Sequence, residues 1–205
     1  MIEPLELIDV YGADAVRYWC ARAVQFGQDG NVTLDSFRER YERELANDLG
    51  NLVSRTTAMI ARYREGRIVP ARWDSPFGSE LAQLAREVPE RLDKYDLSGA
   101  LEAIWIVVRS LNRYVEERAP WQLAKDTTKS DELDRTLYDL ADGLRAVAIA
   151  LAAYLPETAP RILSALGQPE DLTWDGVAYG WTAAAEGIVP AEPLFPRVEL
   201  ETAVA

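Results

Sequence analysis

The chain has no histidine and only one cysteine among its 205 residues. The lack of histidine excludes every catalytic triad that uses an imidazole as base, and it also excludes most zinc sites. Cys20 has no partner for an internal disulfide, which suits a reducing, cytoplasmic compartment. We expect its side chain to be packed, as most cysteines are. Neither metal nor redox chemistry is therefore indicated.

Long apolar runs are absent as well. No stretch of about eighteen apolar residues is available to cross a bilayer, and the first residues lack the basic and apolar regions of a signal peptide. We expect no membrane partner.

Positive charge is scarce, with 22 Lys and Arg against 34 Asp and Glu, which gives a net charge of −12. That balance argues against broad capture of nucleic acid through phosphates, and we expect no DNA partner. RNA binding would require basic residues that gather locally. Two groups could do so: Arg55, Arg62, Arg64 and Arg67, and Arg109, Arg113 and Arg118.

Helical periodicity is the strongest pattern that the sequence does have. Apolar residues recur at spacings of three and four, and Gly50 is a place where the first long helix could bend. Ser98 is the expected N-cap of a later one. Long amphipathic helices with short connections predict an all-α helical bundle. The long helices are expected at 34–63, 98–118 and 131–154, and shorter ones at 4–10, 13–22, 80–94 and 160–166.

Two polar side chains and one aromatic stand out against this background. Asn51 and Arg55 lie one turn apart on the polar face of the first long helix, with Asn47 one turn earlier. Trp121 directly follows Pro120, which ends another long helix. An amide, a guanidinium and an indole brought together could stack on an unpaired base and read its edge. We therefore expect Asn51, Arg55 and Trp121 to converge on one exposed patch.

Each of these residues also has a plainer interpretation. A tryptophan in a helical protein is more often part of the core, and an arginine on a solvated helix face needs no ligand. Asn112 and Arg113 could extend the patch, but a simple exposed face explains them equally well. Paired carboxylates such as Glu116 and Glu117 arise by chance in so acidic a chain.

The same residues carry a family resemblance. Asn-Leu-Val-Ser-Arg at 51–55 and Ala-Pro-Trp at 119–121 resemble the anticodon-reading elements of methionyl-tRNA synthetases, which are class I aminoacyl-tRNA synthetases. Supporting stretches follow in the family's order, at 3–9, 11–18, 26–30, 172–176 and 194–197.

The resemblance implies a role for each position. Asn51 and Arg55 would contact the first base of the CAU anticodon of methionine tRNA, while Pro120 shapes the pocket and Trp121 stacks in it. Asn47, Arg62, Asn112 and Arg113 would be further possible tRNA contacts. Arg145, on the last long helix, is expected to be a neutral position for RNA binding.

The resemblance covers the anticodon-binding half of the family and not its catalytic half. The histidine motif, the Lys-Ser loop and a glycine-rich phosphate cradle are not found in this sequence. We therefore expect no catalytic residue and no cofactor here, with ATP used only by a catalytic domain, which is itself a possible partner. The alternatives are a free-standing module that binds protein or tRNA, and an inactive fragment.

The expected organisation has three parts. Residues 1–33 would form a connector resembling the family's stem-contact region, 34–167 the helical bundle, and 168–205 a tail that packs back on it. Trp19 and Phe26 are expected to be unusually exposed, since this connector normally packs on the catalytic half. Asp14 and Arg17 are expected to form a local ion pair.

Overall fold

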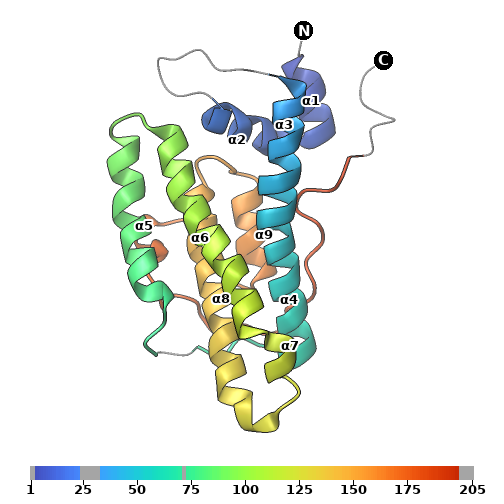
Figure 1. Cartoon of the computed structure of the whole chain (residues 1–205), viewed down its shortest axis with the longest axis vertical. Helices are drawn as coiled ribbons and strands as arrows, with labels where there is room; N and C mark the ends of the chain where they lie inside the picture. The colour runs from blue at the N-terminus through green and yellow to red at the C-terminus, as the bar shows by residue number, and fades with distance from the viewer. Residues whose placement is uncertain (1–2, 24–32, 71–72, 199–205) are drawn as a thin grey trace.

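The computed structural model describes residues 3–23, 33–70 and 73–198. Within these residues the only β-pairing is an isolated bridge between Ile68 and Ala185, so the predicted all-α fold is confirmed. The elements, labelled in Figure 1, are α1 (Pro4–Tyr11), α2 (Ala13–Ala23), α3 (Leu34–Arg40), η1 (Tyr41–Gly50), α4 (Asn51–Arg64), α5 (Phe77–Leu92), α6 (Leu97–Arg118), α7 (Pro120–Leu123), η2 (Thr127–Lys129), α8 (Ser130–Leu151), α9 (Thr158–Ala165) and η3 (Trp174–Val177).

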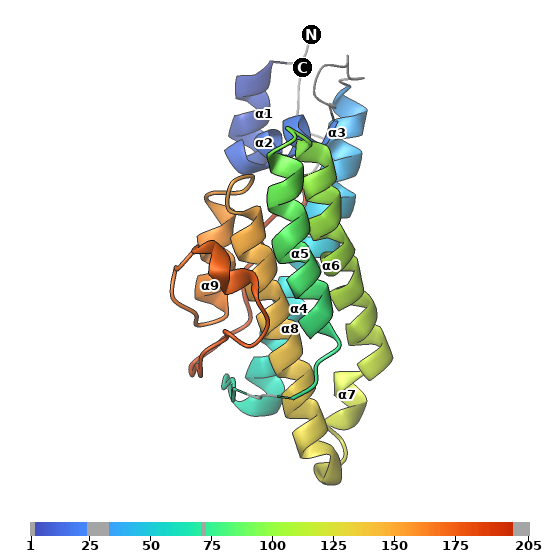
Figure 2. The same ribbon diagram turned by 90° about the vertical axis from the view of Figure 1, so that its left-hand side faces the viewer.

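The long helices run side by side along the long axis of the molecule. Figures 1 and 2 show α5, α6, α8 and the rod formed by α3, η1 and α4 lying roughly parallel, with α1 and α2 across one end and α7 at the other. Helix α8 is central, and every residue from Thr136 to Leu151 is buried. Gly143 allows α6 to approach α8 closely, because a Cβ there would lie 2.5 Å from a methyl carbon of Leu111. None of the helices in the described part of the chain has the length and apolar content that a membrane span requires.

The rod from Leu34 to Arg64 begins where the sequence predicts. The Thr33 side chain accepts a hydrogen bond from the backbone N–H of Ser36 at 3.1 Å, which caps the first turn. Gly50 does not interrupt the helix. Instead the turns of η1 are wider than α-helical ones, and the N–H of Asn51 bonds to the carbonyl of Ala46, five residues back. The polar face of α4 therefore starts directly after this widened segment.

Helix α6 starts one residue before the predicted position, and its N-cap is Asp96 rather than Ser98. The Asp96 carboxylate accepts a hydrogen bond of 2.9 Å from the N–H of Gly99, and Arg91 donates to its other oxygen at 2.7 Å. The hydrogen bond from Gly99, and then the one from Arg91, hold the pKa of Asp96 below its usual value.

This cap gives a prediction with a defined pH dependence. A carboxyl whose pKa is lowered by folding stabilises the protein above its unfolded pKa, and that stabilisation is lost as the pH falls through the folded pKa. At pH 7, Asp96→Ala should lower the free energy of unfolding by about 1 kcal/mol, as for other N-caps. The difference from wild type should shrink below about pH 4. Urea denaturation measures it, with Ser98→Ala expected to cost about 0.5 kcal/mol or less. A larger loss in Ser98→Ala would assign the cap to the serine.

The N-terminal helices differ from expectation at Trp19, Cys20 and Asp14. Trp19 is buried and only 5% exposed, because Phe37 packs edge-on against its ring at a centroid distance of 5.5 Å. Phe26 lies outside the described residues. Cys20, expected to be packed, is exposed on the outer face of α2.

Asp14 does not pair with Arg17 in the described structure. Its carboxylate accepts the backbone N–H groups of Glu157 and Thr158 at 3.1 and 2.7 Å, and so satisfies donors at the start of α9. A buried carboxylate, Glu44, fixes α2 to the rod: it accepts a hydrogen bond from Tyr18 and lies 3.5 Å from the guanidinium of Arg22. Polar contacts thus hold α2 against the bundle.

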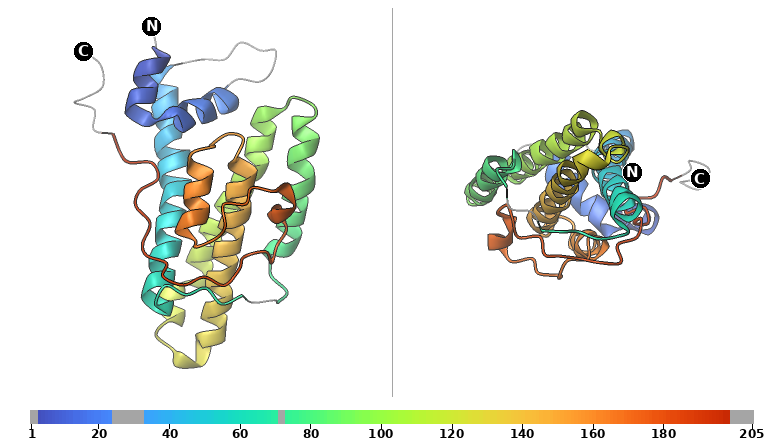
Figure 3. Two further views of the ribbon diagram at one scale, coloured as in Figure 1. Left: turned by 180° about the vertical axis from the view of Figure 1, so that it is seen from behind. Right: turned by 90° about the horizontal axis from the view of Figure 1, so that it is seen from below.

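The segment after α9 lies against α8, α5 and the rod, as Figure 3 shows from behind. Trp174 donates its indole N–H to the carbonyl of Ala85 at 3.1 Å. Further along, the N–H of Ala191 bonds to Thr57 Oγ1 at 2.9 Å, and Tyr41 donates to the carbonyl of Pro196 at 2.7 Å.

Arg145 is at the centre of these contacts. Its side chain is 5% exposed and lies 3.0 Å from the fully buried carboxylate of Asp142. It also donates to Thr182 Oγ1 at 3.1 Å and to the carbonyls of Ala178, at 2.9 Å, and Gly176. This guanidinium therefore ties the last segment to α8, and its expected neutrality for RNA binding stays a prediction.

Candidate nucleic-acid interface

One face of α4 and the short helix α7 line a shallow, open pocket of about 210 Å³. Positions 55, 58, 59, 62 and 63 follow the spacing that places side chains on a single face of a helix. Trp121 lies across from them on α7. The lining residues are Arg55, Ala58, Met59, Arg62, Tyr63 and Trp121.

A sharp turn of the chain brings Trp121 to this pocket. Ala119 adopts the left-handed conformation with φ of 42°, and its N–H closes α6 on the carbonyl of Val115. Pro120 then starts α7, where its fixed φ suits a first helical position and its missing N–H costs nothing. Pro120 is buried, whereas Trp121 is only partly buried and packs against the edge of the core. The indole thus forms a wall of the pocket.

Arg55 reaches from α4 to α6. Its guanidinium donates to the Glu116 carboxylate at 2.6 Å, and the side chains are 41% and 60% exposed respectively. Exposed ion pairs of this kind contribute at most about 1 kcal/mol, so a ligand acceptor can replace the carboxylate.

The two expected basic clusters are mostly neutralised. In the first group, Arg64 pairs with Asp134, and Arg67 lies 3.1 Å from Glu65. The other two members, Arg55 and Arg62, line the pocket. Each member of the second group pairs with a carboxylate: Arg109 with Glu102, Arg113 with Glu117 and Arg118 with Glu132.

The remaining predicted contacts lie around the pocket or away from it. Asn51 is exposed one turn before Arg55, and its amide donates to Asn47 at 3.4 Å, but it does not line the pocket. Convergence is therefore found for Arg55 and Trp121 only. Asn112 donates to the carbonyls of Asp48 and Val108 at 2.9 and 3.0 Å, which makes it a link between η1 and α6.

Sequence reasoning missed part of this site. Met59 and Tyr63 have the apolar helical spacing typical of core residues, yet both line the pocket, four and eight residues after Arg55. Their spacing from Arg55 was the available signal. The contact of Glu116 with Arg55 had no such signal, since it joins positions 61 residues apart. Among the residues that the structure describes, no cluster of carboxylates, cysteines or histidines could hold a metal ion.

Comparisons with known proteins agree with the resemblance. Residues 1–57 match the family described as "tRNA synthetases class I (M)". Over its full length the chain is 37% identical to the methionine–tRNA ligase of Caldanaerobacter subterraneus subsp. tengcongensis, and it spans 33% of that protein. It is 40% identical to the enzyme of Enterococcus faecalis, again over all of this chain and 32% of the relative. Over its whole length the chain is thus similar to about one third of a methionyl-tRNA synthetase.

Solved structures of the family agree in three dimensions. The methionyl-tRNA synthetase of Mycobacterium tuberculosis bound by methionyl-adenylate superimposes with a TM-score of 0.87 at 31% identity, over 96% of this chain and 40% of that one. The apo form from the same organism gives a TM-score of 0.86. This chain therefore spans about one third of the methionyl-tRNA synthetases that it matches in sequence.

Proposed function

We propose that this chain is the anticodon-binding part of a methionine–tRNA ligase and recognises the CAU anticodon of methionine tRNA. The observation that carries the proposal is the pocket shared by Arg55 and Trp121, which come from helices far apart in the sequence. An aromatic wall with a guanidinium beside it suits an unstacked base, because the ring stacks on the base face while the N–H groups donate to its edge.

The proposed roles follow from the contacts. Trp121 stacks on the first anticodon base, and buried Pro120 fixes the start of α7 beneath it. Arg55 exchanges the Glu116 carboxylate for acceptors on the base, and exposed Asn51 extends the edge-reading surface by one turn. Binding energy from this remote site would position the tRNA for a catalytic domain that uses ATP and methionine.

The same proposal assigns the rest of the chain. Residues 1–33 form a connector, 34–167 the bundle and 168–205 a tail. On α1, Leu5 is 73% and Val10 39% exposed, and such apolar side chains suit contact with a catalytic domain or chain. They would equally suit a free-standing protein-binding module. The RNA titration below distinguishes the two, because such a module would not prefer the CAU loop.

The test is a titration of the chain with RNA hairpins of one stem whose loops carry CAU or a permuted anticodon. We expect tighter binding of the CAU loop, by about tenfold or more for loss of a single good base contact. Fluorescence anisotropy at two salt concentrations separates this preference from phosphate binding, which depends on ionic strength. Equal affinity for both loops would exclude anticodon recognition by this chain.

A further inference from the structure

Arg62 differs from the neighbouring cations of α4 in what it contacts. Arg55 faces Glu116 at 2.6 Å, and Arg64 faces Asp134. In the described part of the chain, Arg62 has no carboxylate within ion-pair distance, and its guanidinium lies over the ring of Tyr63, 5.7 Å from the centroid. The pocket thus contains one arginine whose charge no neighbouring acid neutralises.

That uncompensated charge is unusual in a chain with a net charge of −12. A guanidinium at the rim of an apolar and aromatic pocket attracts an anion most strongly when no carboxylate competes for it. Arg62 lies two helical turns beyond Arg55, which is roughly 10 Å along the axis, so the two arginines flank opposite ends of the pocket. A ligand with a flat base and a phosphate would engage the Trp121 ring and both arginines together.

We propose that Arg62 binds the backbone phosphate of the nucleotide whose base occupies the Trp121 pocket, and that Tyr63 positions it. The inference rests on the proposed function and adds a division of roles within the site. Arg55 reads the base edge and confers sequence preference, whereas Arg62 contacts the backbone and adds affinity without preference. Tyr63 holds the planar guanidinium against its ring, which limits the conformations that Arg62 must lose on binding.

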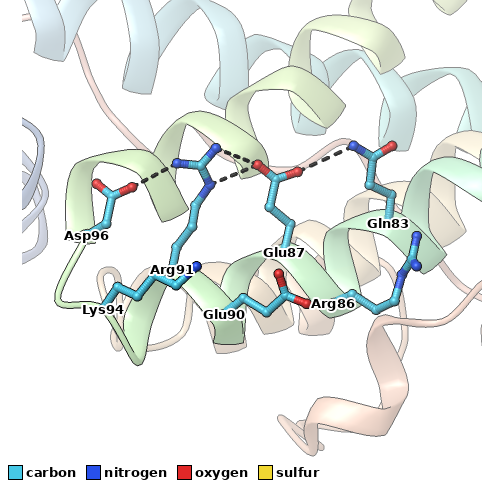
Figure 4. A pocket seen from close by; sticks show the side chains of 7 residues that line it. All are labelled: Gln83, Arg86, Glu87, Glu90, Arg91, Lys94 and Asp96. Atoms are coloured by element: carbon cyan, nitrogen blue, oxygen red, sulfur yellow. Dashed lines mark hydrogen bonds and ion pairs between the residues drawn. The ribbon is translucent and has the colours of Figure 1, made fainter.

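The first experiment compares Arg62→Gln with Arg86→Gln on the CAU hairpin. Arg86 is a matched control: it is exposed on α5, remote from the pocket, and Figure 4 shows it among Gln83, Glu87 and Glu90 without an ion pair. We expect Arg62→Gln to bind about tenfold more weakly, as for loss of one charged hydrogen bond. The slope of log affinity against log salt should fall in magnitude by about 0.7, the value for one phosphate contact on a single strand. Arg86→Gln should match wild type in both measurements.

The second experiment removes the phosphate charge instead. Hairpins carrying one uncharged methylphosphonate linkage, placed at each loop position in turn, are titrated with wild type and with Arg62→Gln. At one linkage the chemical change should weaken wild type but leave Arg62→Gln unaffected, because both changes remove the same contact. Additive losses at every linkage would overturn the assignment of Arg62 to a phosphate.

Variants of Tyr63 test the positioning role. Tyr63→Phe keeps the ring and should bind RNA as wild type does. Tyr63→Leu removes the ring and should lose part of the RNA affinity that Arg62 contributes. Within the Arg62→Gln background, Tyr63→Leu should add no further loss. An equal loss in both backgrounds would show that Tyr63 acts on the RNA directly, and would overturn its role as a support for Arg62.

The outcomes separate this inference from the proposed function. If the CAU loop is preferred and Trp121→Ala weakens binding, but Arg62→Gln behaves as Arg86→Gln does, the phosphate assignment fails alone. If Arg62→Gln weakens binding while Trp121→Ala does not, Arg62 acts outside the pocket and the inference also fails. If wild type binds the CAU loop and the permuted loop equally well, the proposed function itself is excluded. Thermal melts of each variant show whether the fold is retained.

Discussion

Replacing Arg145 with Met should lower the free energy of unfolding by about 3–5 kcal/mol, the usual cost of removing one partner from a buried ion pair. The reason is the environment of Asp142, whose fully buried carboxylate would lose the guanidinium 3.0 Å away. The carbonyls of Gly176 and Ala178 would lose their donor as well. Chemical denaturation followed by circular dichroism measures the change.

Arg161→Met provides the matched control, because Arg161 is exposed on α9 and the substitution is the same. We expect it to change the free energy of unfolding by about 0.5 kcal/mol or less. Asp142→Asn in the Arg145→Met background should recover none of the loss, because the two carboxylate oxygens accept the backbone N–H groups of Gly180 and Thr182, and an amide has only one acceptor oxygen. A loss below about 1 kcal/mol in Arg145→Met would mean that water replaces the guanidinium, contrary to the burial described above.

Replacing Trp121 with Ala should weaken binding of the CAU hairpin by about 1–3 kcal/mol, the contribution of one base–aromatic stack. The indole is only partly buried, so its exposed face is available to a base while its inner face packs on the core. Trp121→Phe should retain part of the affinity, because a smaller ring still stacks. Titrations and thermal melts on the same variants measure binding and stability together.

Trp181 is the control for the loss of a tryptophan as such. It is 58% exposed and borders a different cavity, near Arg145 and Gln168. Trp181→Ala should leave RNA affinity unchanged. If Trp121→Ala destabilised the fold by roughly 3–5 kcal/mol without an RNA defect, the indole would be a core residue and nothing more.

Much of the architecture follows from local pattern. Apolar residues at helical spacing predict the long helices α6 and α8 and the rod that ends in α4 to within a few residues, since each must bury one face. Element ends are less certain because capping groups compete. Asp96 and Ser98 are both acceptable N-caps, and Asp96 takes the position since Arg91 also binds its carboxylate.

Contacts between distant residues account for the errors. Asp14 lies 143 positions before Glu157, whose N–H it accepts, so the nearby Arg17 was the only visible partner in the sequence. Trp19 is covered by Phe37, which belongs to a different helix. For the candidate site, the expected convergence of Arg55 and Trp121 rests on their side-chain chemistry and on the family motif, because no helical periodicity links positions on different helices. The sequence could not show that Arg62 differs from the other arginines of α4, because this difference depends on where the carboxylates lie in space.

The contact between Ala191 and Thr57 has a mechanical consequence. Two residues along an α-helix correspond to a rotation of about 200°, so Thr57 lies on the side of α4 opposite Arg55. The N–H of Ala191 bonds to Thr57 Oγ1 at 2.9 Å, and that oxygen also donates to the carbonyl of Val53 at 3.0 Å. A ligand that pulls on Arg55 would tend to rotate α4 about its axis. The hydrogen bond from Ala191, on the opposite side of the helix, opposes that rotation. A residue 136 positions later in the chain thus helps to hold Arg55 on the outer side of α4, together with the buried face of that helix.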